Sequence, residues 1–212
     1  AGAATFATLA APRLAAGQAA RVLRFVPHTD LAVLDPLWSN ALVTRNHAFL
    51  VFDTLFGQDN AYRARPQMLE GFTTEADGLR WTLRLREGLR FHDGEPVLAR
   101  DAVASLNRWS RRDPFGQALM AATDELSAAD DRTIVFRLKK PFPLLPDALG
   151  KTSAMVAPIM PARLADGDPN RQVTEMIGSG PFRFKPDERL AGDRTVYERF
   201  AEYRPNPNGP TE

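Results

Sequence analysis

Two pairs of adjacent acidic residues are the candidates for catalytic chemistry in the 212-residue chain. Asp124–Glu125 and Asp130–Asp131 each place two carboxyl groups side by side, and carboxyl pairs perform general acid–base catalysis in many hydrolases. Asp130–Asp131 lies between two short extended runs, and aspartates in such turns usually accept hydrogen bonds from nearby backbone N–H groups. We interpret this pair as turn residues, with hydrolysis by any of the four acids as the alternative.

The histidines and the lack of cysteine give little indication of a metal site or of thiol chemistry. His28, His47 and His92 are far apart and form no HxxxH or HExxH spacing, and His92 is interpreted as a turn residue on the exposed side of a hairpin. The chain has no cysteine, which excludes disulfides, thiolate nucleophiles and cysteine-bound metals. We therefore expect no metal site and no cofactor.

Other motifs of catalysis or nucleic-acid binding are also missing. There is no GxxxxGK[ST] phosphate loop and no GxSxG elbow, and the glycine-rich stretch 178–182 contains Pro181 and precedes no expected helix. The composition, with 44% hydrophobic and 25% charged residues and a net charge of +1, is ordinary for a globular protein and shows no cationic cluster. These features predict neither an enzyme nor a nucleic-acid-binding protein.

The first twenty residues have the composition of a secretory signal peptide. Residues 1–11 are apolar and rich in alanine, Pro12 follows, and small residues surround position 16. No other apolar run approaches the roughly 20 residues that span a bilayer. We expect residues 1–20 to be the remnant of a signal peptide and the mature protein to be soluble and exported to the periplasm.

The elements that follow are mixed strands and helices. A short strand is expected at 21–26, and a helix from Thr44, as the N-cap, to Gly57, as the stop signal. Trp81, Leu83 and Leu85 alternate with polar residues and predict a strand. A helix with an apolar stripe should follow, formed by Val97, Ala102, Val103, Leu106 and Trp109.

Further helices and hairpins are expected in the second half of the chain. Short helices are predicted within 115–125 and 141–150, the second bracketed by prolines. Hairpins are predicted around Asp130–Asp131 and around a turn at Gly192–Asp193. The dipeptides Asp77–Gly78 and Asp93–Gly94 tolerate positive φ and predict tight turns.

Five stretches, taken together, resemble one protein family. "LRLREGLRFHDGEPVLARDAV" (83–103), with Trp81 before it, resembles the signature of the periplasmic solute-binding proteins of ABC importers that bind peptides, dipeptides and nickel. The four other stretches occur in the family's order and carry the resemblance from Arg21 to Tyr203. They are "VLDPLW" (33–38), "VFDTLFGQDNAYRARPQMLEGF" (51–72), "DDRTIVFRLKKPFPLLPDAL" (130–149) and "IGSGPFRF" (177–184).

The resemblance implies a mixed α/β fold with two lobes that close on a ligand. Members are usually longer, so the chain is expected to supply the first lobe and its extra subdomain in truncated form. We expect lobe one to start at 21–43, an inserted α/β subdomain at 44–170, and a return to lobe one at 171–212. The signature at 81–103 would then support the fold and would not form part of the ligand-binding site.

The implied function is capture of a solute for a membrane permease, without catalysis, by a protein expected to be a monomer. We expect a peptide-like ligand first, and nickel or another small solute second. The partner could also be a sensor protein in place of the permease. The resemblance implies ligand contacts from Asp30, with Leu31 and Ala32 offering main-chain groups, and from Phe115. Trp38 is a candidate because aromatics on loops often line clefts. The alternatives without ligand contact are that Asp30 is a solvated acid on the loop and that Trp38 and Phe115 pack in the core.

Overall fold

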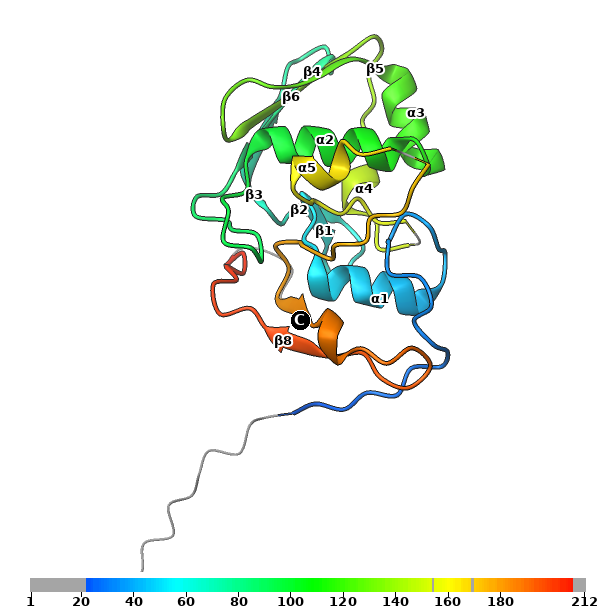
Figure 1. The fold of residues 1–212 in the computed structure, drawn as a ribbon. Coiled ribbons are helices and arrows are strands. Elements are labelled where there is room, and N and C mark those ends of the chain that lie inside the picture. The colour runs from blue at the N-terminus through cyan, green and yellow to red at the C-terminus, as the bar shows by residue number, and fades with distance from the viewer. Residues whose placement is uncertain (1–21, 154, 169, 208–212) are drawn as a thin grey trace, which may run out of the picture.

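A four-stranded antiparallel sheet covered by helices on one face forms the larger part of the structure (Figure 1). This computed structural model describes residues 22–153, 155–168 and 170–207. The helices are α1 (Leu42–Val51), α2 (Ala99–Ser110), α3 (Pro114–Ala122), α4 (Leu145–Gly150), α5 (Ala162–Ala165) and the 3-10 helix η1 (Pro186–Glu188). The strands are β1 (Phe56–Gln58), β2 (Ala64–Pro66), β3 (Leu69–Thr74), β4 (Arg80–Leu85), β5 (Thr123–Ala128), β6 (Thr133–Leu138), β7 (Phe182–Phe184) and β8 (Tyr197–Arg199).

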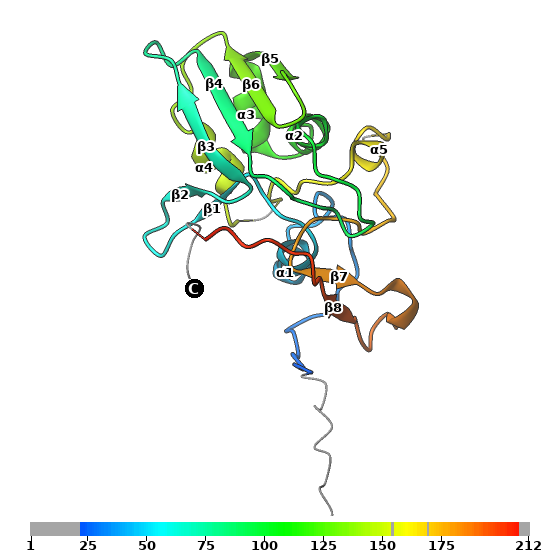
Figure 2. The same cartoon turned by 90° about the vertical axis from the view of Figure 1, so that its left-hand side faces the viewer.

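The main sheet has the strand order β3-β4-β6-β5, and its open face looks toward the viewer in Figure 2 with α2, α3 and α4 behind it. The alternation predicted in β4 is confirmed, because Trp81, Leu83 and Leu85 are buried. They meet the buried side chains of β6 across the pair, with Trp81 opposite Phe136 and Leu83 opposite Ile134. Alternate residues of both strands therefore supply the core that the helices cover.

Most of the expected helices and turns are confirmed. α2 buries Ala102, Leu106 and Trp109 of the predicted stripe; α4 lies within the stretch predicted at 141–150, and α3 overlaps the stretch predicted at 115–125 but begins one residue earlier, at Pro114. The three turns predicted at Asp-Gly or Gly-Asp pairs have a glycine at positive φ, with values of +70° at Gly78, +91° at Gly94 and +79° at Gly192. Hairpins β5–β6 and β7–β8 lie where they were predicted.

The helix predicted from Thr44 to Gly57 is wrong at both ends. α1 begins at Leu42, and the Thr44 hydroxyl donates to the carbonyl of Val33 instead of capping the helix. The chain leaves the helix after Val51 because the next residues serve other partners: Asp53 forms an isolated bridge with Ile159, and Phe56 opens β1. Tertiary pairing thus overrides a sequence pattern that continues as a helix.

The strand predicted at 21–26 is absent over the described residues 22–26, and residue 21 and the expected signal peptide at 1–20 lie outside them. The segment is extended, and within the described part of the chain no backbone hydrogen bond holds it. Val22, Leu23, Phe25 and Val26 are 71%, 94%, 72% and 90% exposed. A strand requires neighbours, and this segment has none here.

A second, smaller core lies where α1 meets the β7–β8 hairpin and the segment before it. Ala48, Val51 and Phe52 of this region pack with Met176 and Phe184. The last described residues lie along the β2–β3 junction, where Arg86 donates to the carbonyls of Arg204 and Pro205. Across the described ranges, no helix has both the length and the apolar character that a membrane span requires.

Candidate ligand-binding loop

The loop 30–38, between the extended segment and α1, carries four of the five predicted site residues. Asp30 and Ala32 are exposed, Leu31 is buried, and Trp38 is half-buried. Phe115 lies in the first turn of α3, half-buried, with its ring 6.1 Å from that of Phe142. Among the described residues no hydrogen bond, ion pair or ring contact joins Phe115 to the loop. The structure therefore brings together the loop residues and leaves Phe115 against the main core.

Every second residue of this loop from Leu31 to Leu37 is held by a side chain from outside the loop. The anchors are Arg189 Nη2 to Leu31 O (2.7 Å), Thr44 Oγ1 to Val33 O (3.0 Å), Arg108 Nη2 to Asp35 Oδ2 (2.7 Å) and Arg112 Nε to Leu37 O (2.7 Å). Leu31 is buried between Asp30 and Ala32, which are exposed, so the side chains of these two residues face the solvent. The loop is thus fixed before any ligand arrives.

The central anchor is a fully buried ion pair between Asp35 and Arg108. Asp35 also accepts the N–H groups of Leu37 (3.0 Å) and Val173 (2.9 Å), and Arg108 Nη2 donates to the carbonyl of Arg171 (3.0 Å). Both side chains are almost inaccessible, at 0% and 2% exposed. The pair therefore joins the loop, α2 and the segment 171–173 at one point.

The sequence did contain a signal for these anchors that the apolar pattern of α2 concealed. Asp101, Ser105, Arg108 and Arg112 recur at helical spacing, and they mark a polar face that is also in contact with the rest of the protein. Asp101 accepts the N–H of Ala162, and Ser105 exchanges hydrogen bonds with Met160. A polar stripe at helical spacing usually faces solvent, but on α2 it forms a second side that packs against the rest of the protein.

The turn "IGSGP" is packed against the end of α1. The N–H of Gly180 donates to Val51 O (2.9 Å), and both Gly178 and Gly180 lie so close to residues 50–52 that a Cβ would overlap them. Glycine is required at both positions because only a bare backbone fits that approach. The motif that carries part of the family resemblance is thus structural.

His92 is buried, so its interpretation as an exposed turn residue is wrong. The ring Nε2 of His92 donates to Gly180 O (3.0 Å), and its backbone N–H donates to Gly178 O (2.9 Å). The ring packs edge-on against Phe200. Burial lowers the pKa of His92, so the ring stays neutral and holds the glycine turn from the other side. Turn residues are usually exposed, but the "IGSGP" segment covers this one.

His47 is also a buried structural imidazole. Its Nδ1 lies 2.7 Å from the Tyr197 hydroxyl, and burial lowers the pKa of His47 to about 4. Among the described residues, no three histidine, aspartate or glutamate side chains gather in a way that would hold a metal ion.

Asp53 is a buried carboxyl between α1 and β1. Its Oδ1 accepts the N–H of Thr54 (2.9 Å), and Arg86 lies near enough to attract its charge. Burial nevertheless dominates and raises the pKa of Asp53 from 3.8 to about 6.

Replacing Asp53 by asparagine is expected to stabilise the protein above about pH 6 and to have little effect below about pH 4. As the pH rises between these values the unfolded chain ionises first, so the native protein loses up to about 3 kcal/mol of stability through this group. Asparagine keeps the Thr54 contact but loses the attraction to Arg86, so we expect a gain of about 1–2 kcal/mol at pH 7.5. Urea denaturation of both proteins at pH 4 and pH 7.5 measures this change in stability. An equal effect of the substitution at both pH values would contradict the explanation.

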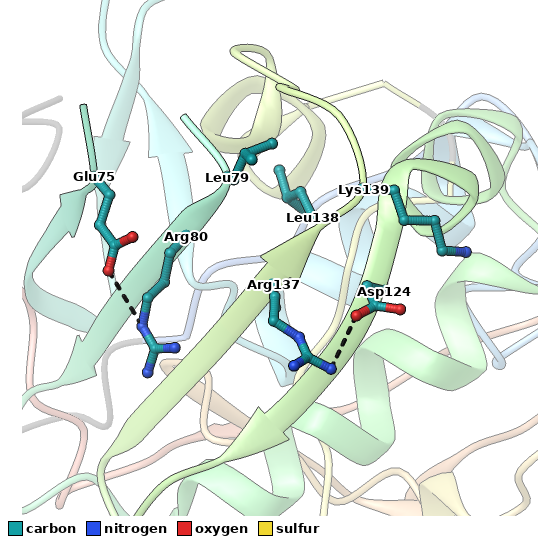
Figure 3. Close-up of a pocket in the computed structure, with 7 residues that line it drawn as sticks. All are labelled: Glu75, Leu79, Arg80, Asp124, Arg137, Leu138 and Lys139. Atoms are coloured by element: carbon teal, nitrogen blue, oxygen red, sulfur yellow. Dashed lines mark ion pairs between the residues drawn. The ribbon is translucent and has the colours of Figure 1, made fainter. Parts of the chain in front are cut away.

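A surface hollow of about 530 Å³ lies on the open face of the main sheet (Figure 3). Arg137 pairs with both Asp124 and Glu125 at 2.9 Å, and Arg80 pairs with Glu75 at 3.7 Å. All of these side chains are about half exposed, so water weakens their interactions. The residues that line the hollow carry three positive and two negative charges, and each of the two carboxylates is paired with an arginine.

The four acids of the hydrolase alternative do not converge. Asp124 and Glu125 are tied to Arg137 on the sheet, whereas Asp130 accepts the N–H of Arg132 (2.8 Å) in the turn between β5 and β6. That hydrogen bond lowers the pKa of Asp130, the opposite of what a general acid requires. The interpretation of Asp130–Asp131 as turn residues is confirmed.

The sequence matches a protein-family model and several curated proteins. The family described as "Bacterial extracellular solute-binding proteins, family 5 Middle" matches residues 63–210. The chain is 39% identical over 181 residues to the probable peptide ABC transporter periplasmic-binding protein y4tO of Sinorhizobium fredii, which covers 85% of the chain and 34% of that relative. It is 28% identical over 176 residues to the glutathione-binding protein GsiB of Pectobacterium atrosepticum, covering 80% of the chain and 32% of the relative.

Solved structures share the fold. The murein tripeptide binding protein MppA of Escherichia coli matches with a TM-score of 0.65 at 24% identity, over 82% of this chain and 37% of that one. The binding protein MoaA from "A.tumefacien R10", in complex with mannopinic acid, matches with a TM-score of 0.69 at 23% identity, over 82% and 36%. The chain spans about a third of the length of these proteins.

Proposed function

The chain belongs to the bacterial extracellular solute-binding proteins of family 5, and from this membership we propose that it is part of the binding component of an ABC importer. That component captures a peptide-like or other small solute between two lobes and delivers it to a membrane permease. The relatives' names, a probable peptide-binding protein and glutathione-binding proteins, support a peptide-like solute. They are binding proteins and not enzymes, which favours capture over hydrolysis.

The observation that carries the proposal is the rigid loop 30–38. Its four anchors come from three segments, α1, the C-terminal end of α2 and the residue after η1, and Asp30 and Ala32 remain exposed with no hydrogen-bond partner among the described residues. A carboxylate and main-chain groups on a fixed loop bind a solute with little loss of conformational entropy. In this proposal Asp30 accepts the cationic end of the solute, and Leu31, whose carbonyl is occupied by Arg189, contributes only its N–H.

The exposed apolar segment 22–26 supports the proposal that further polypeptide completes lobe one. Large side chains point out on both faces of this segment, as in strands that are covered on both sides. Exposed apolar residues in such a row are unfavourable in water and indicate a surface that is normally covered. The chain's span of about a third of its relatives agrees with this.

The proposed division places lobe one at 21–43 and 171–212 and the inserted subdomain at 44–170. The main sheet and its helices form the body of the subdomain, while α1 at its start packs against β7 of the returning segment. Ligand would then bridge lobe one and a second lobe, and closure would follow from the tighter binding of ligand to the closed state.

The partners and location follow from the same family membership. The protein is proposed to act as a monomer in the periplasm, because the relative y4tO is named a periplasmic-binding protein. The cognate permease recognises the closed state with solute bound.

Native mass spectrometry of the full-length exported protein, purified without denaturation, is expected to show a bound small solute. Calorimetry with that solute should then show that the 212-residue chain binds at least about 100-fold more weakly than the full-length protein, because one lobe encloses only part of a ligand. In the full-length protein, Asp30→Asn should weaken binding about 10-fold. Sub-micromolar affinity of the 212-residue chain, or a solute that is chemically changed on binding, would overturn the proposal.

A further inference from the structure

The turn between β1 and β2, residues 59–63, presents a tyrosine at its tip. Figure 2 shows this turn projecting from the edge of the molecule, on the side opposite α5. Tyr62 is 81% exposed, and among the described residues neither a side-chain hydrogen bond nor a ring contact engages it. Its ring therefore contributes little to the packing of the fold.

The backbone at Tyr62 has a conformation that this kind of turn usually assigns to glycine. The Tyr62 N–H donates to Asp59 O (2.8 Å), the Asp59 N–H donates to Arg63 O (3.0 Å), and φ at Tyr62 is +58°. These contacts define a three-residue hairpin loop, in which a type I turn is followed by a left-handed residue. Glycine suits that last position because it has no Cβ, so a tyrosine there costs free energy. The chain keeps a strained residue whose ring does not support the fold, and such strain often marks functional positions.

Asp59 holds the backbone of this tip in place. Its Oδ1 accepts the N–H groups of Ala61 (2.9 Å) and Arg63 (3.0 Å). Its Oδ2 accepts from the Nε of Arg63 (3.2 Å) and from the Nε of Arg65 (3.0 Å). A side chain presented on a preformed loop loses little conformational entropy when it binds a partner.

Two arginines share the single carboxylate of Asp59, which leaves the tip with one net positive charge. The side chains of Arg63 and Arg65 are exposed, and their Nη groups donate to no described residue. Tyrosine and arginine are among the residue types that contribute most to affinity at protein interfaces. A tyrosine ring with free arginine donors beside it fits a pocket whose rim carries carboxylates.

An anionic bilayer would be a poorer partner for the same tip. Stable binding to a bilayer surface takes a lipid anchor, an amphipathic helix or a cluster of basic residues. The tip has one aromatic ring and one net charge, which is too little for such binding. A protein pocket, in contrast, encloses the whole ring and excludes water around it.

We propose that the 59–63 tip docks on an acidic pocket of the cognate permease. The Tyr62 ring enters the pocket, and Arg63 and Arg65 bind carboxylates at its rim. This inference rests on the importer function proposed above and adds to it a contact surface on the binding protein. Among the described residues no hydrogen bond or ion pair joins the tip to the loop 30–38, so docking at the tip leaves the solute contacts unchanged.

Binding of the full-length protein, with its co-purified solute, to the cognate permease in lipid nanodiscs tests the contact. Tyr62→Asn removes the ring and supplies a residue that tolerates the left-handed conformation, and it should weaken binding at least about 10-fold. Arg63→Gln should weaken binding about 3-fold or more, and added salt should weaken the wild-type complex. Leu190→Asn, at a half-exposed apolar residue beside the turn between β7 and β8, should change the affinity less than about 2-fold.

Thermal denaturation separates loss of the contact from loss of the fold. Tyr62→Asn should leave the melting temperature of the full-length protein unchanged or raise it, because strain at this position is relieved. A lower melting temperature would show that the ring stabilises the fold and would overturn the proposal. Protection of Tyr62 from nitration in the free full-length protein would also overturn it, because further polypeptide would then cover the ring.

The remaining outcomes separate this inference from the function on which it rests. If Tyr62→Asn binds the permease as tightly as the wild type does, the inference is refuted and the importer function stands. Equal binding of the wild type to empty nanodiscs of anionic lipid, weakened by Tyr62→Asn, would assign the tip to the membrane and refute the permease contact. If the wild type binds neither permease nanodiscs nor empty ones, the importer function and this inference fail together.

Discussion

Replacing Gly178 by alanine is expected to destabilise the protein by about 4 kcal/mol or to prevent folding. A Cβ at this position would overlap the carbonyl oxygen of Val51 and would lie 2.7 Å from Cδ1 and 2.8 Å from Cα of Phe52. Two of these three atoms belong to the backbone at the end of α1, which cannot turn aside as a side chain can. The turn and α1 would have to separate, and the small core between them would open.

Thermal or urea denaturation of Gly178→Ala beside Gly71→Ala isolates this steric effect. Gly71 lies on the edge strand β3, and no atom lies within 4 Å of the Cβ that alanine would add there. Gly71→Ala should therefore change stability by no more than about 0.5 kcal/mol. Similar small effects of both substitutions would show that the close packing of Gly178 against α1 does not stabilise the native state.

The same contact explains why α1 was difficult to delimit from the sequence. Residues 44–57 have helical apolar spacing throughout, and local propensity offers no reason to stop at Val51. The helix ends there because the "IGSGP" turn, more than 120 residues later, occupies the carbonyl of Val51, and Asp53 pairs with Ile159. Contacts between distant segments leave no local signal, so boundaries of this kind escape a local pattern.

Elements that depend on neighbouring residues were predicted well. Alternation placed β4 and β6, and the Asp-Gly pairs placed two turns, because side-chain direction and positive φ are local properties. His92 was misplaced because its burial comes from a segment that the hairpin pattern does not include. The segment 22–26 has the composition of a strand but no neighbour to pair with in the described chain, and composition alone does not form a sheet.

The candidate site was predictable only in part for the same reason. The family resemblance singled out Asp30 to Ala32, and the loop position singled out Trp38. The arginines that anchor the loop, Arg108, Arg112 and Arg189, were not predicted as part of the site, because arginine side chains are usually solvated. The polar stripe of α2 was the signal that could have identified two of them.

Replacing Arg108 by methionine is expected to destabilise the protein by about 3–5 kcal/mol, because it leaves the charge of Asp35 buried without a counter-ion. The N–H groups of Leu37 and Val173 would still donate to that carboxylate, but neutral donors offset its burial only in part. Methionine fills much of the same volume, so the loss measures charge rather than a cavity. Denaturation by urea, monitored by tryptophan fluorescence, gives the value.

The double substitution Asp35→Asn and Arg108→Met distinguishes a lost ion pair from lost packing. Asparagine still accepts a backbone N–H and carries no charge, so the double variant should be more stable than Arg108→Met alone by about 1–2 kcal/mol. Arg163→Met, which removes an exposed arginine from its pairs with Asp93 and Glu175, should cost less than about 1 kcal/mol. If the double variant were the least stable of the three, the buried charge would not be the cause. Since the same ion pair fixes the loop that presents Asp30, Arg108→Met should also loosen that loop, and solute affinity of the full-length protein should fall while the folded state persists.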